Sequence, residues 1–437
     1  MYMIYCIYAH NSWAKMEENM KKALIIIPLL ISLILFGCAR TEREPDSSST
    51  RVPSGSIVSD DEIEPVIADT VEDGLWNFSA ALFSDTAREE GEDSIVISPI
   101  SVIYAMGMTS NGAAGGTLKQ AENTFGSHME DLNGFLDSYR DFLTEDGDVS
   151  VTLANGIWFN SNMGFKANDS FLDINRRYYG ATVTQSEFDR ACVKAINDFV
   201  RENTQGMIDD VINDLSSETV MCLVNAIGFV GAWDEEYAEN DIHPYYFTDI
   251  DGSDIQTDFM RSTESCYLSG SDCYGFTKSY EGGRFEFVAL VPNEDVDIMD
   301  FIASLNGSKL TGILSNGMYG RVYVDMPMFE SRYRTELSGI LSGMGMSRFF
   351  DPMTADLSGI GEADGNIYVS DVIHDAYIKV DEKGTRAAAS TEVLVNVTAA
   401  APQEDAYHVT LDRPFIFMIV DTQYSLPVFM GSVLRMG

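Results

Sequence analysis

The chain has 437 residues, of which 45% are hydrophobic, so it is long enough to bury a large core and its composition is that of a globular protein. Its 68 acidic residues outnumber the 28 lysines and arginines and give a formal net charge of −40. Because phosphate binding needs clustered Lys and Arg, this balance argues against nucleic acid and anionic lipid headgroups as partners. We interpret the acidity as solubility or salt adaptation rather than as an acidic binding patch.

The N-terminal region has the pattern of an export signal preceded by an extension. Lys21 and Lys22 stand before the apolar run 23–36, which is shorter than the about 20 residues that a membrane-spanning helix needs. That pattern is typical of a secretory signal peptide. We therefore expect residues 20–38 to be the signal peptide and residues 1–19 to lie upstream of a true start at Met20.

Residues 39–68 are rich in Ser, Pro and charge and have almost no core-forming side chains. Such a composition predicts a disordered acidic tether. Residues 69–437 contain neither a second linker nor a tandem repeat, so we predict one domain there. Within it, Cys266 and Cys273 flank a turn-like stretch, which leaves both a local disulfide and free thiols open.

Helical and strand patterns alternate irregularly along this domain. Ser98 is placed to cap a helix that begins at Pro99. Ile196, Phe199 and Val200 have helical spacing, Gly206 is expected to end that helix, and a further helical turn is expected after it. Apolar runs predict strands at 221–234, 284–293, 320–330 and 413–421, the second and fourth buried on both faces. The mixture predicts an α+β fold with large sheets.

The common motifs of hydrolases, zinc proteases and nucleotide-binding proteins are missing from the sequence. We therefore predict a protein that is not an enzyme and that uses no cofactor and no metal. His374 lies in an apolar strand pattern, where a hydrogen-bonded structural role is favoured over the base of a triad. The acidic stretch 249–254 lacks the ligand spacing of a calcium loop, so we interpret it as a solvated turn.

The stretch 381–397, DEKGTRAAASTEVLVNV, is the most unusual part of the sequence. Read with the period of a strand, every second residue from Thr385 to Val397 is small or β-branched and uncharged, whereas Arg386 and Glu392 fall on the opposite face. The three alanines favour a helix, but the β-branched residues oppose it. Small side chains suit a segment that enters a narrow slot between other strands.

These residues resemble the serpin family. The stretch 381–391 is similar to the hinge of inhibitory serpins, and further motifs follow in the family's order: LANGIWF from Leu153, INDFVRENTQGMIDDVI, LVNAIGFVGAWD, FMRS, DMPMFE, ADLSGI and RPFIFMIVDTQYSLPVFMGSV. The resemblance covers residues 69–436. It implies a fold of three β-sheets with about eight to nine helices and an exposed reactive-centre loop. It also implies a suicide substrate that traps serine proteases by inserting the cleaved loop into the main sheet.

The resemblance also assigns individual residues. The hinge is Glu382, Lys383, Gly384, Thr385, Arg386, Ala387, Ala388, Ala389, Ser390 and Thr391. The polar cluster beneath the main sheet, called the shutter, matches Ser98, Ser101, Asn225 and His374, and Trp233 matches the breach at the top of the sheet. The end of the signal peptide resembles the lipobox of prokaryotic lipoproteins, which implies lipidation of Cys38 and a domain held at the cell envelope, periplasmic or extracellular.

Counting from Gly384 in the family's spacing places the reactive bond between Thr398 and Ala399, with Val397 or Ala399 as alternative primary residues. The surrounding side chains are small, which implies an elastase-like or subtilisin-like target bound in a covalent one-to-one complex. Asn396 begins a glycosylation sequon that would obstruct cleavage if it were used. We expect a monomer without a heparin-like site. The alternative is a non-inhibitory serpin that acts as a binding or chaperone-like module at the envelope.

Overall fold

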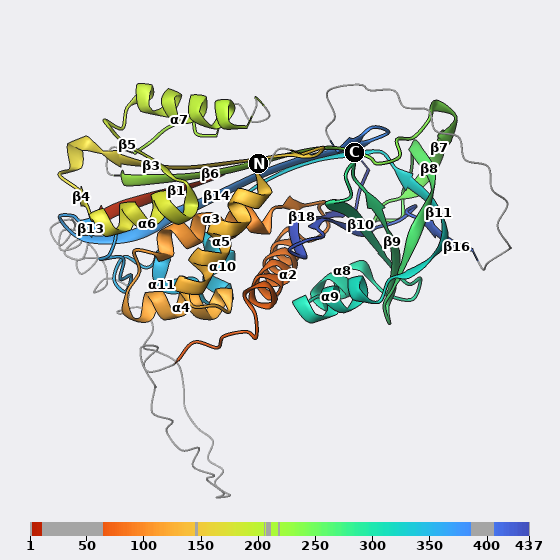
Figure 1. The fold of residues 1–437 in the computed structure, drawn as a ribbon, viewed down its shortest axis with the longest axis horizontal. Helices are drawn as coiled ribbons and strands as arrows, with labels where there is room; N and C mark the ends of the chain where they lie inside the picture. Colours follow the sequence, from red (N-terminus) through yellow and green to blue (C-terminus); the bar gives the residue numbers. More distant parts are fainter. Residues whose placement is uncertain are drawn as a thin grey trace, which may run out of the picture.

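The computed structural model describes residues 2–10, 64–144, 147–204, 206, 211–216, 219–385 and 406–436, the first of these ranges by its backbone only. These residues form two large β-sheets and one two-stranded sheet, with helices packed around them (Figure 1). The arrangement confirms the predicted serpin fold of mixed helices and three sheets.

The main sheet has seven strands and lies edge-on across the upper part of Figure 1. The helix α7 covers one face and most other helices lie on the opposite face. Its path runs through β1 (Tyr2–His10), β14 (Asn366–Asp381), β15 (Gly384–Thr385), β6 (Thr219–Ala232), β3 (Ser150–Asn160) and β5 (Thr182–Ser186), and β12 (Phe329–Glu336) pairs with β14.

The second sheet has nine strands and makes the other half of the molecule. Its order is β16 (Tyr407–Thr410), β11 (Met318–Pro327), β8 (Asp254–Ser269), β9 (Cys273–Ser279), β10 (Phe285–Pro292), β17 (Phe415–Asp421), β18 (Leu426–Val433) and β2 (Val96–Ile97), with β7 (Ile242–Thr248) paired to β8. The third sheet joins β4 (Lys166–Ala167) to β13 (Gly361–Glu362).

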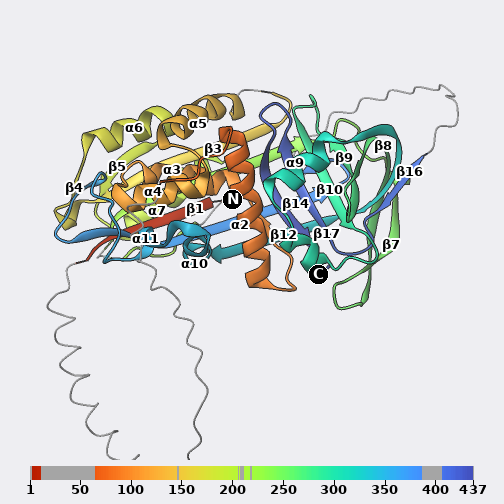
Figure 2. The ribbon, with the colours of Figure 1, turned by 90° about the horizontal axis from the view of Figure 1, so that it is seen from below.

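The helix α2 (Val71–Glu90) lies between the helical half and the second sheet (Figure 2). It begins at Thr70, whose hydroxyl oxygen accepts from the Asp73 N–H at 3.1 Å, a standard N-cap. The other α-helices are α3 (Pro99–Ser110), α4 (Gly115–Phe125), α5 (Met129–Leu143), α6 (Asp169–Tyr179), α7 (Arg190–Asn203), α8 (Ile298–Ala303), α9 (Gly307–Ser315), α10 (Ser338–Leu341) and α11 (Ser347–Phe350). None of the helices in the described ranges is long and apolar enough to cross a membrane.

Most predicted elements are present, with shifts at their ends. Ser98 caps α3 as predicted, and β10 and β17 are almost entirely buried. The helix α7 ends before Gly206, at the cap Thr204, and the further turn predicted beyond it falls largely on residues outside the described ranges. The run 320–330 spans two strands, since β11 ends at Pro327 and β12 begins at Phe329.

Cys266 and Cys273 are buried free thiols. Cys266 stands opposite Thr277 in the pairing of β8 with β9, so the hairpin register does not bring the two sulfurs together as partners. Burial raises the pKa of the Cys273 thiol to about 11. These cysteines are therefore unreactive core residues at neutral pH.

No strand was predicted where the structure places β1. Residues 2–10 pair antiparallel with β14 on one side and with β6 on the other, so they fill the middle of the main sheet. Their assignment as an extension upstream of Met20 stays a prediction, as do the signal peptide and the tether, because residues 11–63 lie outside the described ranges. The described chain resumes at Glu64, and the Ala68 N–H donates to the Gly126 carbonyl at 2.9 Å beside α4.

Candidate functional site

The candidate site begins where the hinge enters the top of the main sheet. Gly384 and Thr385 form β15, which pairs with Ala232 and Gly231 of β6 on one side and with the end of β14 on the other. Gly384 has φ of +149°, and a Cβ added there would lie 2.1 Å from the Gly231 carbonyl oxygen. Only glycine fits this position. The hinge therefore already occupies the first two positions of a new central strand.

Thr385 shows how the hinge is oriented. Its side chain is 3% exposed, and its hydroxyl is hydrogen-bonded to the hydroxyl of the buried Tyr280. Thr385 is the first residue of the small, uncharged face predicted from the sequence, so that face is the one that points into the core at this position. Arg386–Thr391 and the predicted reactive bond Thr398–Ala399 lie outside the described residues.

Trp233 holds the chain that leads into the hinge. Its indole N–H donates to the Asp381 carbonyl at 2.9 Å, and its backbone N–H donates to the Lys383 carbonyl at 3.0 Å. Its ring stacks on Tyr280 with 4.6 Å between centroids. Through its side chain and its backbone N–H, Trp233 thus joins the end of β14, the turn at Glu382 and Lys383, and Tyr280, the partner of Thr385.

A buried ion pair beneath Trp233 was not predicted from the sequence. Lys278 is 3% exposed, and its Nζ lies 3.0 Å from Oε1 of Glu264. The same ammonium lies 4.6 Å from the ring centroid of Tyr237 and 5.5 Å from that of Trp233. Two aromatic faces thus compensate in part for the lost hydration. In the sequence, a single lysine within the apolar strand β9 is the feature that could have indicated this ion pair.

The four predicted shutter residues lie in one hydrogen-bonded cluster beneath the sheet. The Ser98 backbone N–H donates to Nε2 of His374 at 3.3 Å, and the Ser101 N–H donates to Oγ of Ser98 at 3.3 Å. The Ser101 hydroxyl donates to Oδ1 of Asn225. Since His374 is on β14 and Asn225 is on β6, the start of α3 connects the two strands that flank the central position.

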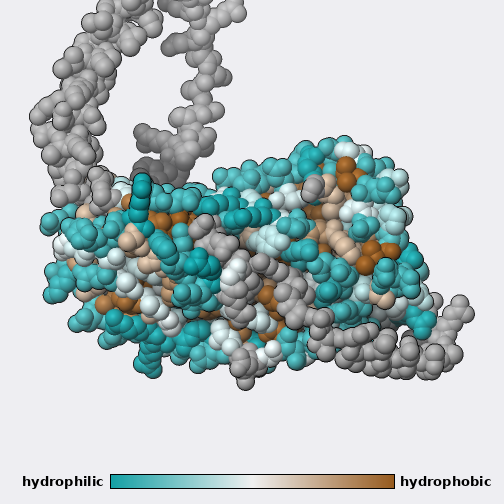
Figure 3. All heavy atoms as spheres, turned by 90° about the horizontal axis from the view of Figure 1, so that it is seen from above, coloured by the Kyte–Doolittle hydropathy of each residue, from teal (hydrophilic) through white to brown (hydrophobic). Residues whose placement is uncertain are grey.

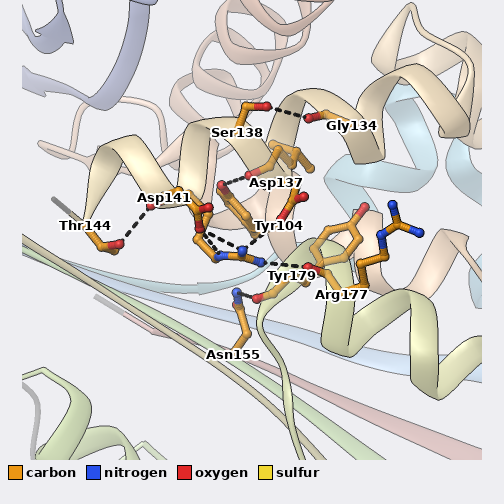
Figure 4. Close-up of polar contacts among 11 residues, drawn as sticks. Tyr104, Gly134, Asp137, Ser138, Asp141, Thr144, Asn155, Arg177 and Tyr179 are labelled. Atoms are coloured by element: carbon orange, nitrogen blue, oxygen red, sulfur yellow. Dashed lines mark hydrogen bonds and ion pairs between the residues drawn. The ribbon is translucent and has the colours of Figure 1, made fainter.

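The cluster continues into helices through residues that the sequence did not single out. Nδ2 of Asn225 donates to Oδ1 of Asn155 at 2.6 Å, and Nδ2 of Asn155 donates to the Tyr179 carbonyl at 2.7 Å. Figure 4 shows Asn155 reaching from the sheet to the end of α6. The Tyr179 hydroxyl then donates to Oδ1 of Asn133 at 2.6 Å. In the sequence, Asn155 stands out as a polar residue within the apolar motif LANGIWF, and this could have indicated a buried polar role.

Asn155→Ala should lower the free energy of unfolding by about 2–3 kcal/mol, because it removes two buried hydrogen bonds, one from the Asn225 amide group and one to the Tyr179 carbonyl. Asn160→Ala is the matched control on the same strand, since Asn160 is also buried and also donates to a backbone carbonyl. Urea unfolding measures both variants. We expect only Asn155→Ala to speed opening of the sheet, read as hydrogen exchange of the β6 amides around Asn225. Equal exchange in the two variants would contradict a link between Asn155 and the shutter.

His374 makes stability depend on pH. Burial lowers its pKa from the ordinary 6.5 to about 3, and its Nδ1 has no hydrogen-bond partner within the described residues. The unfolded chain therefore takes up a proton first as pH falls below about 6.5, and the folded state loses stability between that pH and about 3. The loss is at most about 1.4 kcal/mol per pH unit.

We expect the free energy of unfolding of the wild type to fall by about 2 kcal/mol more than that of His374→Gln between pH 6.5 and pH 5. The comparison of the two chains removes the contribution of the carboxylates, which titrate in both. Urea unfolding at each pH provides the measurement. Parallel pH profiles would show that His374 is not buried in the neutral form.

Comparison with known proteins agrees with this geometry. A family model described as Serpin (serine protease inhibitor) matches residues 73–436. An uncharacterized serpin-like protein of Thermococcus kodakarensis is 25% identical, covering 95% of this chain and 99% of that protein. The protein Iris of Ixodes ricinus is 30% identical, covering 82% of this chain and 97% of its own length.

Solved structures give the same result. The thermophilic serpin tengpin in its native state is 34% identical, with a TM-score of 0.78, and the match covers 86% of this chain and 99% of that one. Members of this family are generally protease inhibitors rather than catalytic enzymes. The family model and the shared fold establish that this chain belongs to the serpin family.

Proposed function

We propose that the protein is an irreversible suicide-substrate inhibitor of serine endopeptidases. The observation that carries the proposal is the hinge, because Gly384 and Thr385 are already paired between β6 and β14. In the sequence that follows, every second residue continues the pattern of small, uncharged side chains. After cleavage the rest of the segment can extend the strand that these two residues begin. A protease still bound as an acyl-enzyme is then carried along and distorted before it can hydrolyse the ester bond.

The size of the expected gain supports this mechanism. Residues 385–398 would span about 46 Å as a strand at about 3.3 Å per residue. Each new backbone hydrogen bond is worth about 1 kcal/mol net, so the added ladder can outweigh the cost of parting two strands. Arg386 and Glu392 fall on the outward face of the pattern, so neither charge needs to be buried.

The predicted target is a protease with a small apolar primary pocket. Residues 395–402 read VNVTAAAP and contain no Lys or Arg, which disfavours trypsin-like enzymes. With Thr398 in the primary position, elastase-like and subtilisin-like enzymes are the best match. The partner is therefore a serine protease held in a covalent one-to-one complex.

We also propose that the mature domain is attached to the cell envelope through a lipid on Cys38. The charge next to the apolar run 23–36 and the cysteine that follows it support this location. The face in Figure 3 is mostly hydrophilic, with apolar residues in separate spots, which favours a monomer. Labelling with a radioactive fatty acid tests the anchor: wild type should be labelled, and Cys38→Ser should not.

The inhibitor proposal is tested by mixing the mature chain, which begins at Cys38, with subtilisin and with pancreatic elastase and resolving the products on denaturing gels. We expect a band at the summed mass that resists SDS. Trypsin is the matched control, because its pocket requires Lys or Arg, and we expect little complex with it. Cleavage of the loop without such a band, for serine and cysteine proteases alike, would instead favour a non-inhibitory binding module.

A further inference from the structure

The strand β1 occupies the path that an inserting loop would take. Gly384 pairs with Ala232 and Thr385 with Gly231, so continuing one residue at a time brings Ser390 opposite Ala226. On the other side the same continuation brings Ser390 opposite Asp375. Tyr2 stands opposite those same two residues, Ala226 and Asp375. The registers with β6 and with β14 therefore agree: β1 begins at the position that Ser390 would take if the loop continued as a strand.

The same strand passes through the shutter. Met3 is the register partner of Asn225 on β6 and of His374 on β14. These two residues belong to the polar cluster that connects the strands from beneath. The sheet is therefore already parted at the shutter, with residues 2–10 as its central strand.

We propose that residues 2–10 form a plug strand that keeps the reactive loop from inserting beyond Ala389. The inference rests on the proposed inhibitory function and adds a control to it. Only the positions of residues 386–389 remain between β15 and β1, and a protease carried over so short a distance would stay near the top of the sheet. The plug must leave before the cleaved loop can complete its strand.

The position of the plug in the chain suggests how it is removed. Residues 2–10 precede Cys38, so cleavage of a signal peptide before Cys38 would detach them from the domain. A chain that starts at Met20 would lack them from the outset. The inhibitor would thus be blocked only in a precursor that starts at Met1.

Cys6 provides a direct test of the placement. It is the register partner of Cys222 on β6. Directly opposed residues in antiparallel strands have Cα atoms about 4.5–5.5 Å apart, within the range of about 4.4–6.8 Å that a disulfide spans. Oxidation by diamide takes one hydrogen from each thiol, forms the S–S bond and converts diamide to its hydrazine.

We expect mass spectrometry of the diamide-treated full chain, purified with residues 1–437 intact, to show a peptide pair joined through Cys6 and Cys222. The cross-link should persist in Cys192→Ser, the matched control, whose cysteine is buried on α7. It should vanish in Cys6→Ser. Absence of the Cys6–Cys222 pair in the wild type would overturn the placement of the plug.

The consequence is tested by cutting the loop with a trace of subtilisin and following the melting temperature, which should rise as the loop inserts. We expect no rise in the oxidised chain and a rise at least tenfold faster in Ile4→Pro than in the reduced wild type. Proline removes a ladder N–H at the centre of β1. Ser12→Pro, just beyond the strand, is the matched control and should behave like wild type.

Equal insertion rates in the oxidised and reduced chains would overturn the plug even if the cross-link forms. This assay does not depend on trapping a protease, so it separates the two proposals. If Ile4→Pro inserts its loop faster yet no chain forms a covalent complex, the inhibitory function fails and the plug stands.

Discussion

Thr385→Arg is expected to convert the inhibitor into an ordinary substrate. Thr385 is 3% exposed and bonded to Tyr280, so an arginine there either places an unpaired charge in the core or pulls the hinge out of the sheet. Burying an unpaired charge costs about 3 kcal/mol or more, which slows insertion roughly a hundredfold. Hydrolysis of the acyl-enzyme then becomes faster than insertion of the loop. The moles of inhibitor consumed per mole of protease inactivated should therefore rise by more than tenfold.

Titration of subtilisin with each variant, made as the mature chain that begins at Cys38, measures that ratio. The matched control is Lys383→Gln, which also changes the charge by one, but at an exposed side chain two residues earlier. Thr385→Ser, which keeps the hydroxyl, should remain close to wild type. If Thr385→Arg inactivates the protease as efficiently as Lys383→Gln does, insertion does not require an uncharged side chain at position 385.

Trp233→Ala is expected to lower the free energy of unfolding by about 3–5 kcal/mol. The side chain is 2% exposed, stacks on Tyr280, and donates to the Asp381 carbonyl. Its removal leaves a cavity, takes away the hydrogen bond to the Asp381 carbonyl, and opens one face beside the ammonium of Lys278. The midpoint of urea unfolding should therefore fall well below that of any other single change proposed for the hinge region.

Trp233→Phe is the matched control, because it keeps an aromatic ring over Tyr280 but loses the indole N–H. We expect it to lose less than half as much free energy as Trp233→Ala. Equal losses would mean that the hydrogen bond to Asp381, rather than the packing, determines the contribution of Trp233.

The sequence predicted the parts of the site that depend on local pattern. The cap at Ser98, the glycine at position 384 and the inward face of Thr385 each follow from the conformational limits of single residues or from the period of a strand. The shutter residues required the resemblance to a family, because their partners are separated by more than 100 positions in the chain.

Other parts could not be read from the sequence. Lys278 looks like an exposed lysine until β8 places Glu264 beside it, and Asn155 gains its role only when α6 brings the Tyr179 carbonyl within reach. The strand β1 is the clearest case. Its aromatic and β-branched residues suit a strand, but its partners lie more than 200 residues away, so no local pattern places it in the main sheet.

The most direct test of the central claim is the intact mass of the product formed between subtilisin and the mature chain, which begins at Cys38 and lacks residues 2–10. We predict a covalent adduct of the protease with the chain cut after Thr398, together with the released fragment from Ala399 to Gly437. A mass spectrum that contains the cut chain and the fragment but only unmodified protease would contradict the claim that this serpin traps its target as an acyl-enzyme.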